Sequence, residues 1–183
     1  PKFRFQADAE DGSDVPIRLK VEINTREIEA FDPIIAMVHR VENSWFEGEA
    51  EIPTFSQEEM LATKLRALLQ RDKGRDLYDL AHALDVFERL VCERVVEMFI
   101  QYLGLSEQVI SRAQAQERMF AKLANPRLLL DMRPLLSAEQ AQALDEEATA
   151  VAFRRVFTKL VDLLPGSPWA KTESMKQRFG ITW

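Results

Sequence analysis

The spacing of apolar residues changes once along the chain, close to Pro53, and this change limits the folds available to it. Before Pro53 apolar and polar side chains alternate, a period of two that is typical of strands with one covered face. The clearest run has apolar side chains at Ile17, Leu19, Val21 and Ile23. After Pro53 apolar residues recur at helical spacing, first at Leu61, Leu65, Leu68 and Leu69. Strands followed by helices predict an α+β fold: a small mixed or antiparallel sheet, then a bundle of about five helices.

The strand layer is expected to occupy residues 1–55 and the helical layer residues 56–183. Strands are predicted around residues 3–5, 17–24, 34–41 and 46–52. Helices are predicted over residues 57–73, from 75 or 76 to 84, and over 88–103, 107–124 and 138–164. Ser followed three positions later by Glu or Gln is typical of a capping box, and such boxes are predicted at Ser56 and Ser137. Gly104 and Ser106 are the expected end of the third helix and cap of the fourth.

Composition places the chain among globular proteins and narrows what it can do. Of its 183 residues, 46% are hydrophobic and 30% are charged, so a core can form. The net charge of −6 does not favour general adhesion to DNA or to an anionic membrane. The sequence contains no run of about 18 apolar residues, so it predicts no membrane span. Cys92 is the only cysteine, which excludes a disulfide framework and a cysteine zinc site, and a reducing cytoplasm is the expected location.

Residues 71–79 concentrate charge around a glycine turn. Three basic side chains flank the turn and two carboxylates follow at spacing i, i+3: Arg71, Lys73, Arg75, Asp76 and Asp79. Aspartate near a helix N-terminus and an i, i+4 pair between Arg75 and Asp79 explain part of this pattern without any function. In the alternative interpretation the basic residues bind phosphate. One aspartate then orients a base, a ribose or a metal-bound water, and the other positions Lys64 or an arginine.

Three further charged residues allow the same choice between a structural and a functional interpretation. Lys64 borders the apolar stripe of the first helix, where either its stem covers the core edge or its ammonium binds phosphate. Lys20 and Glu22 lie on one face of the second strand, which is either solvated or a platform for a magnesium-binding carboxylate. The sequence has no P-loop, no dinucleotide glycine fingerprint and no Gly-x-Ser-x-Gly elbow.

Three segments in this order resemble the AbiEii/AbiGii-type nucleotidyltransferase toxins, a branch of the polymerase-β-like nucleotidyltransferases. They are Lys20-Val21-Glu22-Ile23-Asn24, Glu59-x-x-x-x-Lys64 and Arg75-Asp76-x-x-Asp79. Residues 130–136 and 164–169 also resemble the helical C-terminal part of such proteins. The resemblance runs from about residue 20 to residue 169. It implies that residues 1–55 are the remainder of a nucleotidyltransferase sheet.

The resemblance implies an enzyme of a type IV toxin–antitoxin or abortive-infection system. Such toxins transfer a nucleotide from an NTP, with Mg²⁺, to an acceptor such as tRNA, and a cognate antitoxin is the expected partner. By the same resemblance Glu22 is the metal-binding carboxylate and Lys64 the catalytic, triphosphate-binding lysine. Asp76 and Asp79 match the last motif, in which one aspartate is needed for activity. The accompanying nucleotide-binding candidates are Lys20, Arg71 and Arg75.

One family motif, Gly-Ser followed by Asp-x-Asp, has no counterpart in this sequence. Because Glu22 alone cannot hold two metals, the chain by itself is expected to be inactive and to be the C-terminal part of a larger enzyme. Uncovered strand edges would then favour a homodimer. Two alternatives stay open: a non-catalytic binding or interaction module derived from the same fold, and an unrelated α+β domain with solvated charges.

Overall fold

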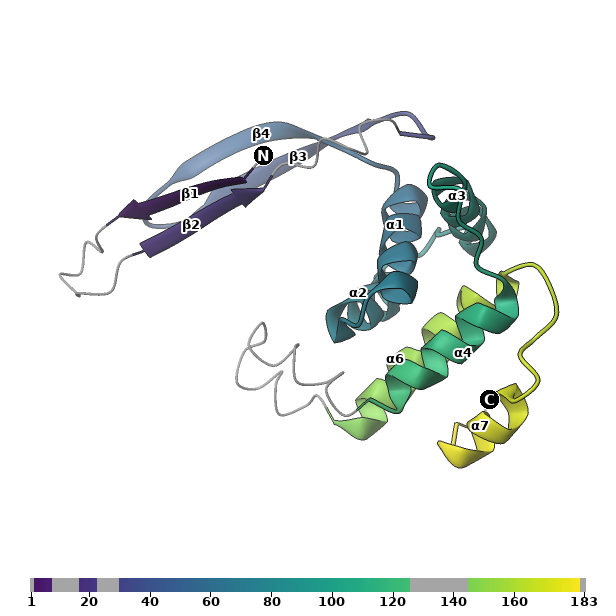
Figure 1. Ribbon diagram of the computed structural model, residues 1–183. Helices are drawn as coiled ribbons and strands as arrows, with labels where there is room; N and C mark the ends of the chain where they lie inside the picture. Colours follow the sequence, from purple (N-terminus) through teal and green to yellow (C-terminus); the bar gives the residue numbers. More distant parts are fainter. Residues whose placement is uncertain (1, 8–16, 23–29, 126–144, 182–183) are drawn as a thin grey trace. The chain divides into compact units, whose positions relative to one another are not determined.

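Two compact units make up the chain, Pro1–Phe31 and Asp32–Trp183. The structure, a computed structural model, describes residues 2–7, 17–22, 30–125 and 145–181 (Figure 1). The first unit holds one strand pair, and the second holds another strand pair and all the described helices. The fold is α+β, with two small antiparallel hairpins followed by six α-helices in the described part of the chain, which confirms the fold class that the sequence predicts.

The first hairpin pairs β1 (Lys2–Ala7) with β2 (Ile17–Glu22) in antiparallel register. The register sets Phe3 opposite Val21 and Phe5 opposite Leu19, so these four side chains share one face, as the alternation predicts. All four are exposed, between 37% and 58% of their surface. The hairpin therefore has an exposed apolar face.

The second hairpin pairs β3 (Ile35–Glu42) with β4 (Glu47–Thr54), also antiparallel. Its turn is fixed by Asn43, whose side-chain oxygen accepts hydrogen bonds from the backbone N–H groups of Trp45 and Phe46 at 2.9 Å. Met37 lies opposite Ile52, and both are exposed. The described strands thus form two separate two-stranded sheets where the sequence predicts one.

Helices α1 (Gln57–Gln70) and α2 (Gly74–Val86) form a corner at a three-residue turn. Ser56 caps α1 as predicted, because its Oγ accepts a hydrogen bond from the backbone N–H of Glu59. The predicted capping box is only half formed, since the Glu59 carboxylate accepts hydrogen bonds from the Asp32 N–H and the Tyr102 hydroxyl instead. Two predicted boundaries are wrong. The first helix ends at Gln70 because Arg71 is extended, and Gly74, expected to stop that helix, is the first residue of α2.

Helices α3 (Cys92–Gly104) and α4 (Arg112–Leu123) both start later than predicted. The chain before α3 is extended at Val91, whose N–H is bound by the carboxylate of Glu58 in α1. The cap of α4 is Ser111 and not Ser106: Ser111 and Gln114 form a complete capping box. Ser106 instead belongs to the turn that ends α3, where its N–H bonds to the carbonyl of Leu103.

Helix α6 (Glu146–Lys159) is followed by the short 3-10 helix η3 (Val161–Leu163) and by α7 (Thr172–Arg178). The continuous helix predicted from residue 138 to 164 is wrong, because Asp145 is extended and caps α6, and Leu160 leaves the helical conformation. The chain then turns at Gly166, which has a positive φ of 103°. The predicted capping box at Ser137 and residues 130–136 lie outside the described residues.

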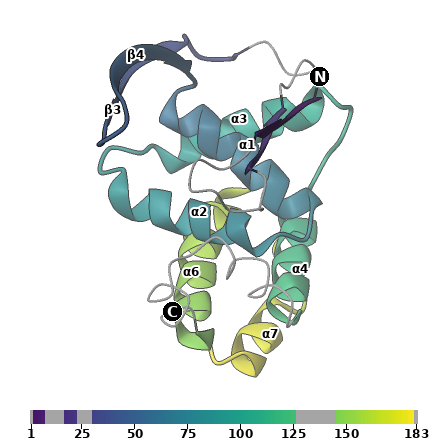
Figure 2. The same ribbon diagram turned by 90° about the vertical axis from the view of Figure 1, so that its left-hand side faces the viewer.

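The core lies between the helices of the second unit. In Figures 1 and 2 α1 packs against α3, α2 packs against α6, and α4 lies beside α6 and α7. The largest fully buried aromatic side chains come from α3, α4 and α6: Phe99, Tyr102, Phe120, Phe153 and Phe157. Among the described residues no helix is long and apolar enough to cross a membrane.

Gln116 of α4 ties the C-terminal segment to the core. Its side-chain oxygen accepts hydrogen bonds from the Trp169 N–H at 2.7 Å and the Thr172 hydroxyl at 2.8 Å. Its amide nitrogen donates to Asp162 at 2.8 Å. Because Gln116 is almost fully buried, these bonds hold the segment before α7 in one place on α4.

Candidate functional site

Lys64 on α1 and Asp79 on α2 meet across the helix corner. The Lys64 ammonium donates to Asp79 Oδ2 at 2.6 Å, although 15 positions separate the residues. The two side chains keep 36% and 47% of their surface accessible. The contact joins an exposed carboxylate to an ammonium with further donors, so the pair is open to a ligand from solvent. Asp79 is therefore paired with Lys64, and not with Arg75 as the i, i+4 spacing had suggested.

Arg71 and Asp76 form a second ion pair next to the first. Arg71 donates from Nε at 2.7 Å and from Nη2 at 2.8 Å, so both carboxylate oxygens of Asp76 are engaged. The Asp76 side chain is fully buried, whereas the Arg71 side chain is about half exposed. The hydrogen bonds to Asp76 raise the pKa of Arg71 further above its usual value, and the charges of Asp76 and Asp79 add to this effect.

Two basic residues of α4 hold the turn between α1 and α2 in place, an arrangement that the sequence did not predict. The buried ammonium of Lys122 donates at 2.6 Å both to the carbonyl of Arg71 and to Asp72. Arg118, one turn earlier, donates to the carbonyl of Leu69 at 3.1 Å. The hydrogen bond from Lys122 lowers the pKa of Asp72. The only sequence signal is two basic residues at i, i+4 on α4, and nothing local connects them to residues 69–72.

A comparison with models of protein families matches most of the chain to a known group. The model described as "Nucleotidyl transferase AbiEii toxin, Type IV TA system" matches residues 1–160. The chain belongs to this family. The match includes both hairpins and helices α1, α2, α3, α4 and α6, and residues 161–183 lie beyond it. Neither the curated proteins nor the solved structures gave a significant match.

The other predicted site residues, Arg75, Lys20 and Glu22, take no part in the two ion pairs. Arg75 is exposed in the first turn of α2 and makes no ion pair within the described residues. Lys20 is an exposed residue of β2, and Glu22 is the last residue of that strand. Both belong to the first unit, so their association with Lys64 stays a prediction.

The described residues do not fit a magnesium site. No group of three or more His, Cys, Asp or Glu side chains converges within them. The two aspartates of the corner are each already bonded to a cationic side chain, Asp76 to Arg71 and Asp79 to Lys64. A divalent cation needs several free oxygen ligands, so the corner is suited to anionic groups instead. The side chain of Glu22 lies outside the part of the chain that the structure describes.

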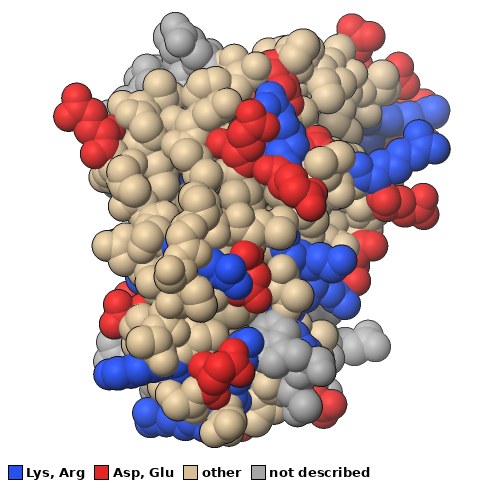
Figure 3. Space-filling model, turned by 90° about the vertical axis from the view of Figure 1, so that its right-hand side faces the viewer, with Lys and Arg blue, Asp and Glu red and all other residues tan. Residues whose placement is uncertain are grey.

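The charges of the second unit are mixed in sign. On the face drawn in Figure 3, basic and acidic side chains are interspersed without forming one broad patch of either sign. This agrees with the overall charge of −6. This face therefore offers no broad basic surface that would attract anions in general.

Proposed function

We propose that Lys64 and Asp79 face the nucleotide in an AbiEii nucleotidyltransferase toxin, which transfers a nucleotide from an NTP to an acceptor such as tRNA. The observation that supports this is the 2.6 Å contact between them, because both side chains stay partly exposed. Asp79 holds the ammonium in place while leaving donors for a phosphate. A lysine ammonium that is already held in position is a strong point charge for a triphosphate, because the side chain does not have to become ordered when the ligand binds.

Arg71, Arg75 and Asp76 have supporting roles in this proposal. Asp76 is fully buried, so it acts as a positioning residue that holds Arg71, and it does not touch substrate. Arg71 keeps its remaining guanidinium nitrogen for phosphate, and the exposed Arg75 adds a second guanidinium on the same helix corner. Of the two aspartates in the last motif, Asp79 is therefore the one that we assign to the reaction.

Metal and turnover are separate parts of the proposal. Magnesium would enter with the NTP and would use Glu22 together with carboxylates that this sequence does not offer, since it contains no Asp-x-Asp. We therefore expect the 183 residues to bind NTP and not to transfer a nucleotide on their own. Lys20, on the same strand as Glu22, would contact the nucleotide when the two units come together.

Binding of a labelled NTP to the whole chain tests the proposal. We expect Lys64→Met and Asp79→Asn each to weaken binding at least tenfold, with Lys159→Met as a matched control because Lys159 is exposed at the far end of α6. Incubation with labelled NTP, Mg²⁺ and tRNA should give no labelled tRNA. Equal affinity in all four proteins would overturn the assignment of the pair, and labelled tRNA would overturn the expectation that the chain is inactive.

The second candidate is a non-catalytic interaction module with the same fold. The exposed apolar side chains of both hairpins, among them Phe5, Leu19 and Met37, favour it. In this case the chain would associate with a second copy or with its cognate antitoxin, and NTP would not bind. Light scattering of the pure chain distinguishes the candidates: a dimer that binds no NTP supports the module, and an NTP-binding monomer excludes it.

A further inference from the structure

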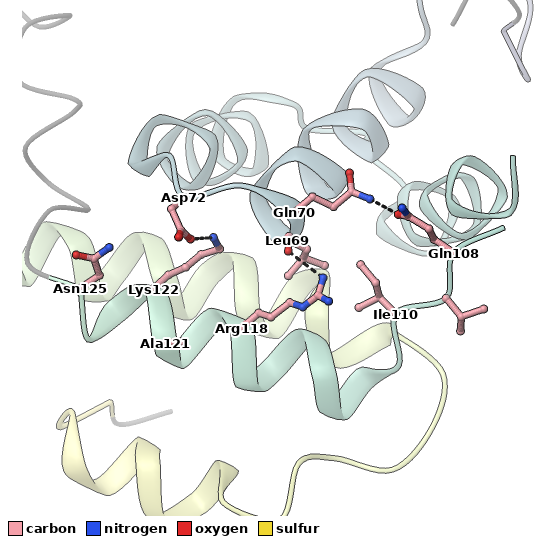
Figure 4. Close-up of a pocket in the computed structure, with 10 residues that line it drawn as sticks. Leu69, Gln70, Asp72, Gln108, Ile110, Arg118, Ala121, Lys122 and Asn125 are labelled. Atoms are coloured by element: carbon pink, nitrogen blue, oxygen red, sulfur yellow. Dashed lines mark hydrogen bonds and ion pairs between the residues drawn. The ribbon is translucent and has the colours of Figure 1, made fainter. Parts of the chain in front are cut away.

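A groove of about 770 Å³ runs along α4 on the outer side of the helix corner. Figure 4 shows its walls: the end of α1 and the following turn, the loop between α3 and α4, and one face of α4. The lining residues of α4 and its C-terminal end follow helical spacing, i, i+3, i+4 and i+7: Arg118, Ala121, Lys122 and Asn125. The short side chain of Ala121 leaves the middle of this face open.

The polar groups in the groove are held in place but not fully used. Arg118 spends one N–H on the Leu69 carbonyl, and its other donors meet no partner within the described residues. Gln70 donates to Gln108 at 2.6 Å, which leaves the Gln70 carbonyl oxygen and the Gln108 amide N–H groups available. A placed guanidinium beside two amides can bind a carboxylate and the N–H and C=O groups of an extended backbone.

The size and the apolar walls of the groove limit the ligand. Residues 118–125 of the chain span about 10 Å along the axis, the length of about three extended residues. Val109 at the rim supplies most of the aliphatic surface, being 86% exposed, whereas the lining residues Leu69 and Ile110 are almost fully buried. None of the lining residues that the structure describes is aromatic, so these residues offer no platform on which a nucleobase would stack. Aliphatic walls and a cation fit a peptide better than a nucleotide.

We propose that this groove binds an extended, acidic segment of a protein partner, with one carboxylate on Arg118 and a neighbouring aliphatic side chain against Val109 and Ile110. The charges are complementary, because the lining contains two cations and a single carboxylate, and that carboxylate, Asp72, is already bonded to Lys122. Neither Lys64 nor Asp79 lines the groove, so the inference does not depend on the nucleotide-binding proposal.

Selection of random octapeptides on the immobilised whole chain tests this inference. We expect the enriched peptides to carry an acidic residue next to an aliphatic one. Their affinity for Arg118→Gln and for Ala121→Phe should fall at least tenfold. Arg89→Gln and Ala124→Phe are matched controls at exposed positions outside the groove lining, and they should bind as the unmodified chain does. Thermal melts would show that all four variants fold.

Three results would overturn the inference. The first is that no peptide distinguishes the unmodified chain from Ala121→Phe. The second is enrichment of basic or neutral peptides that bind Arg118→Gln equally well. The third is that labelled hexauridylate binds and loses affinity in both groove variants, which would make the groove a nucleic-acid site. Lys64→Met is expected to bind the selected peptides normally, so failure here and failure of the NTP-binding proposal are distinguishable.

Discussion

Arg71 binds Asp76 through two hydrogen bonds, yet the two partners differ in their access to water. Asp76 is fully buried, and 48% of the Arg71 side chain is accessible. A buried carboxylate that loses its partner has no water to replace it, whereas an exposed guanidinium does. The pair therefore depends on Arg71 more than its position on the surface suggests, and it fixes the extended turn that separates α1 from α2.

Asp76→Asn should destabilise the protein more than Asp79→Asn. The first change removes a buried, charge-assisted pair and should lower the free energy of unfolding by about 2 kcal/mol. The second removes a partly exposed pair, for which less than about 1 kcal/mol is expected. Urea unfolding of both variants gives the two free energies of unfolding, which can be compared if the free energy falls with urea concentration at the same slope in both. Equal losses would mean that burial of Asp76 does not set the strength of its pairing.

Acid should destabilise the protein through Asp32. A hydrogen bond from Arg94 and a second from Ser56 hold the pKa of Asp32 below its usual range. A carboxyl whose pKa is lower in the folded state adds stability above its unfolded pKa of about 4. That stability is lost as the pH falls through the folded pKa. Unfolding free energies measured from pH 7 to pH 3 should fall less steeply in Arg94→Gln, while Arg89→Gln should follow the unmodified chain.

Gln116→Ala should release the C-terminal segment. The variant loses the acceptor for Trp169 and Thr172 and the donor to Asp162, so the segment before α7 has fewer bonds to α4. Trypsin cleavage at Lys171, followed by mass spectrometry, should become at least several-fold faster. Glu117→Gln, at the next and exposed position of α4, is the matched control. An unchanged cleavage rate would show that apolar packing alone holds the segment.

Phe120→Ala should be among the most destabilising single changes. The Phe120 ring is fully buried, and its centroid lies 5.3 Å from those of Phe153 and Phe157 and 6.2 Å from that of Trp169. Truncation of a buried phenylalanine costs about 3–5 kcal/mol, because the cavity collapses only in part. Phe179→Ala, a half-buried ring at the edge of the same cluster, should cost clearly less in the same unfolding experiment. The reverse order would contradict this description of the core.

Helix ends show where sequence reasoning succeeded and failed. The cap at Ser56 was predictable because capping involves residues three positions apart. Ser111 and Gln114 carry the same local signal, whereas Ser106, the predicted cap, belongs to the preceding turn. The start of α3 was not predictable, since Glu58 of another helix holds the N–H of Val91.

The sequence by itself determined the order of strands and helices, the faces of the strands and the family to which the chain belongs, because periodicity and motif spacing are local properties of the chain. The tertiary structure alone decided which aspartate is buried against Arg71 and which stays open with Lys64. It also placed the Lys122 ammonium, some 50 positions away in the sequence, against the turn between α1 and α2. These choices depend on how helices pack, and packing joins residues whose separation along the chain carries no pattern.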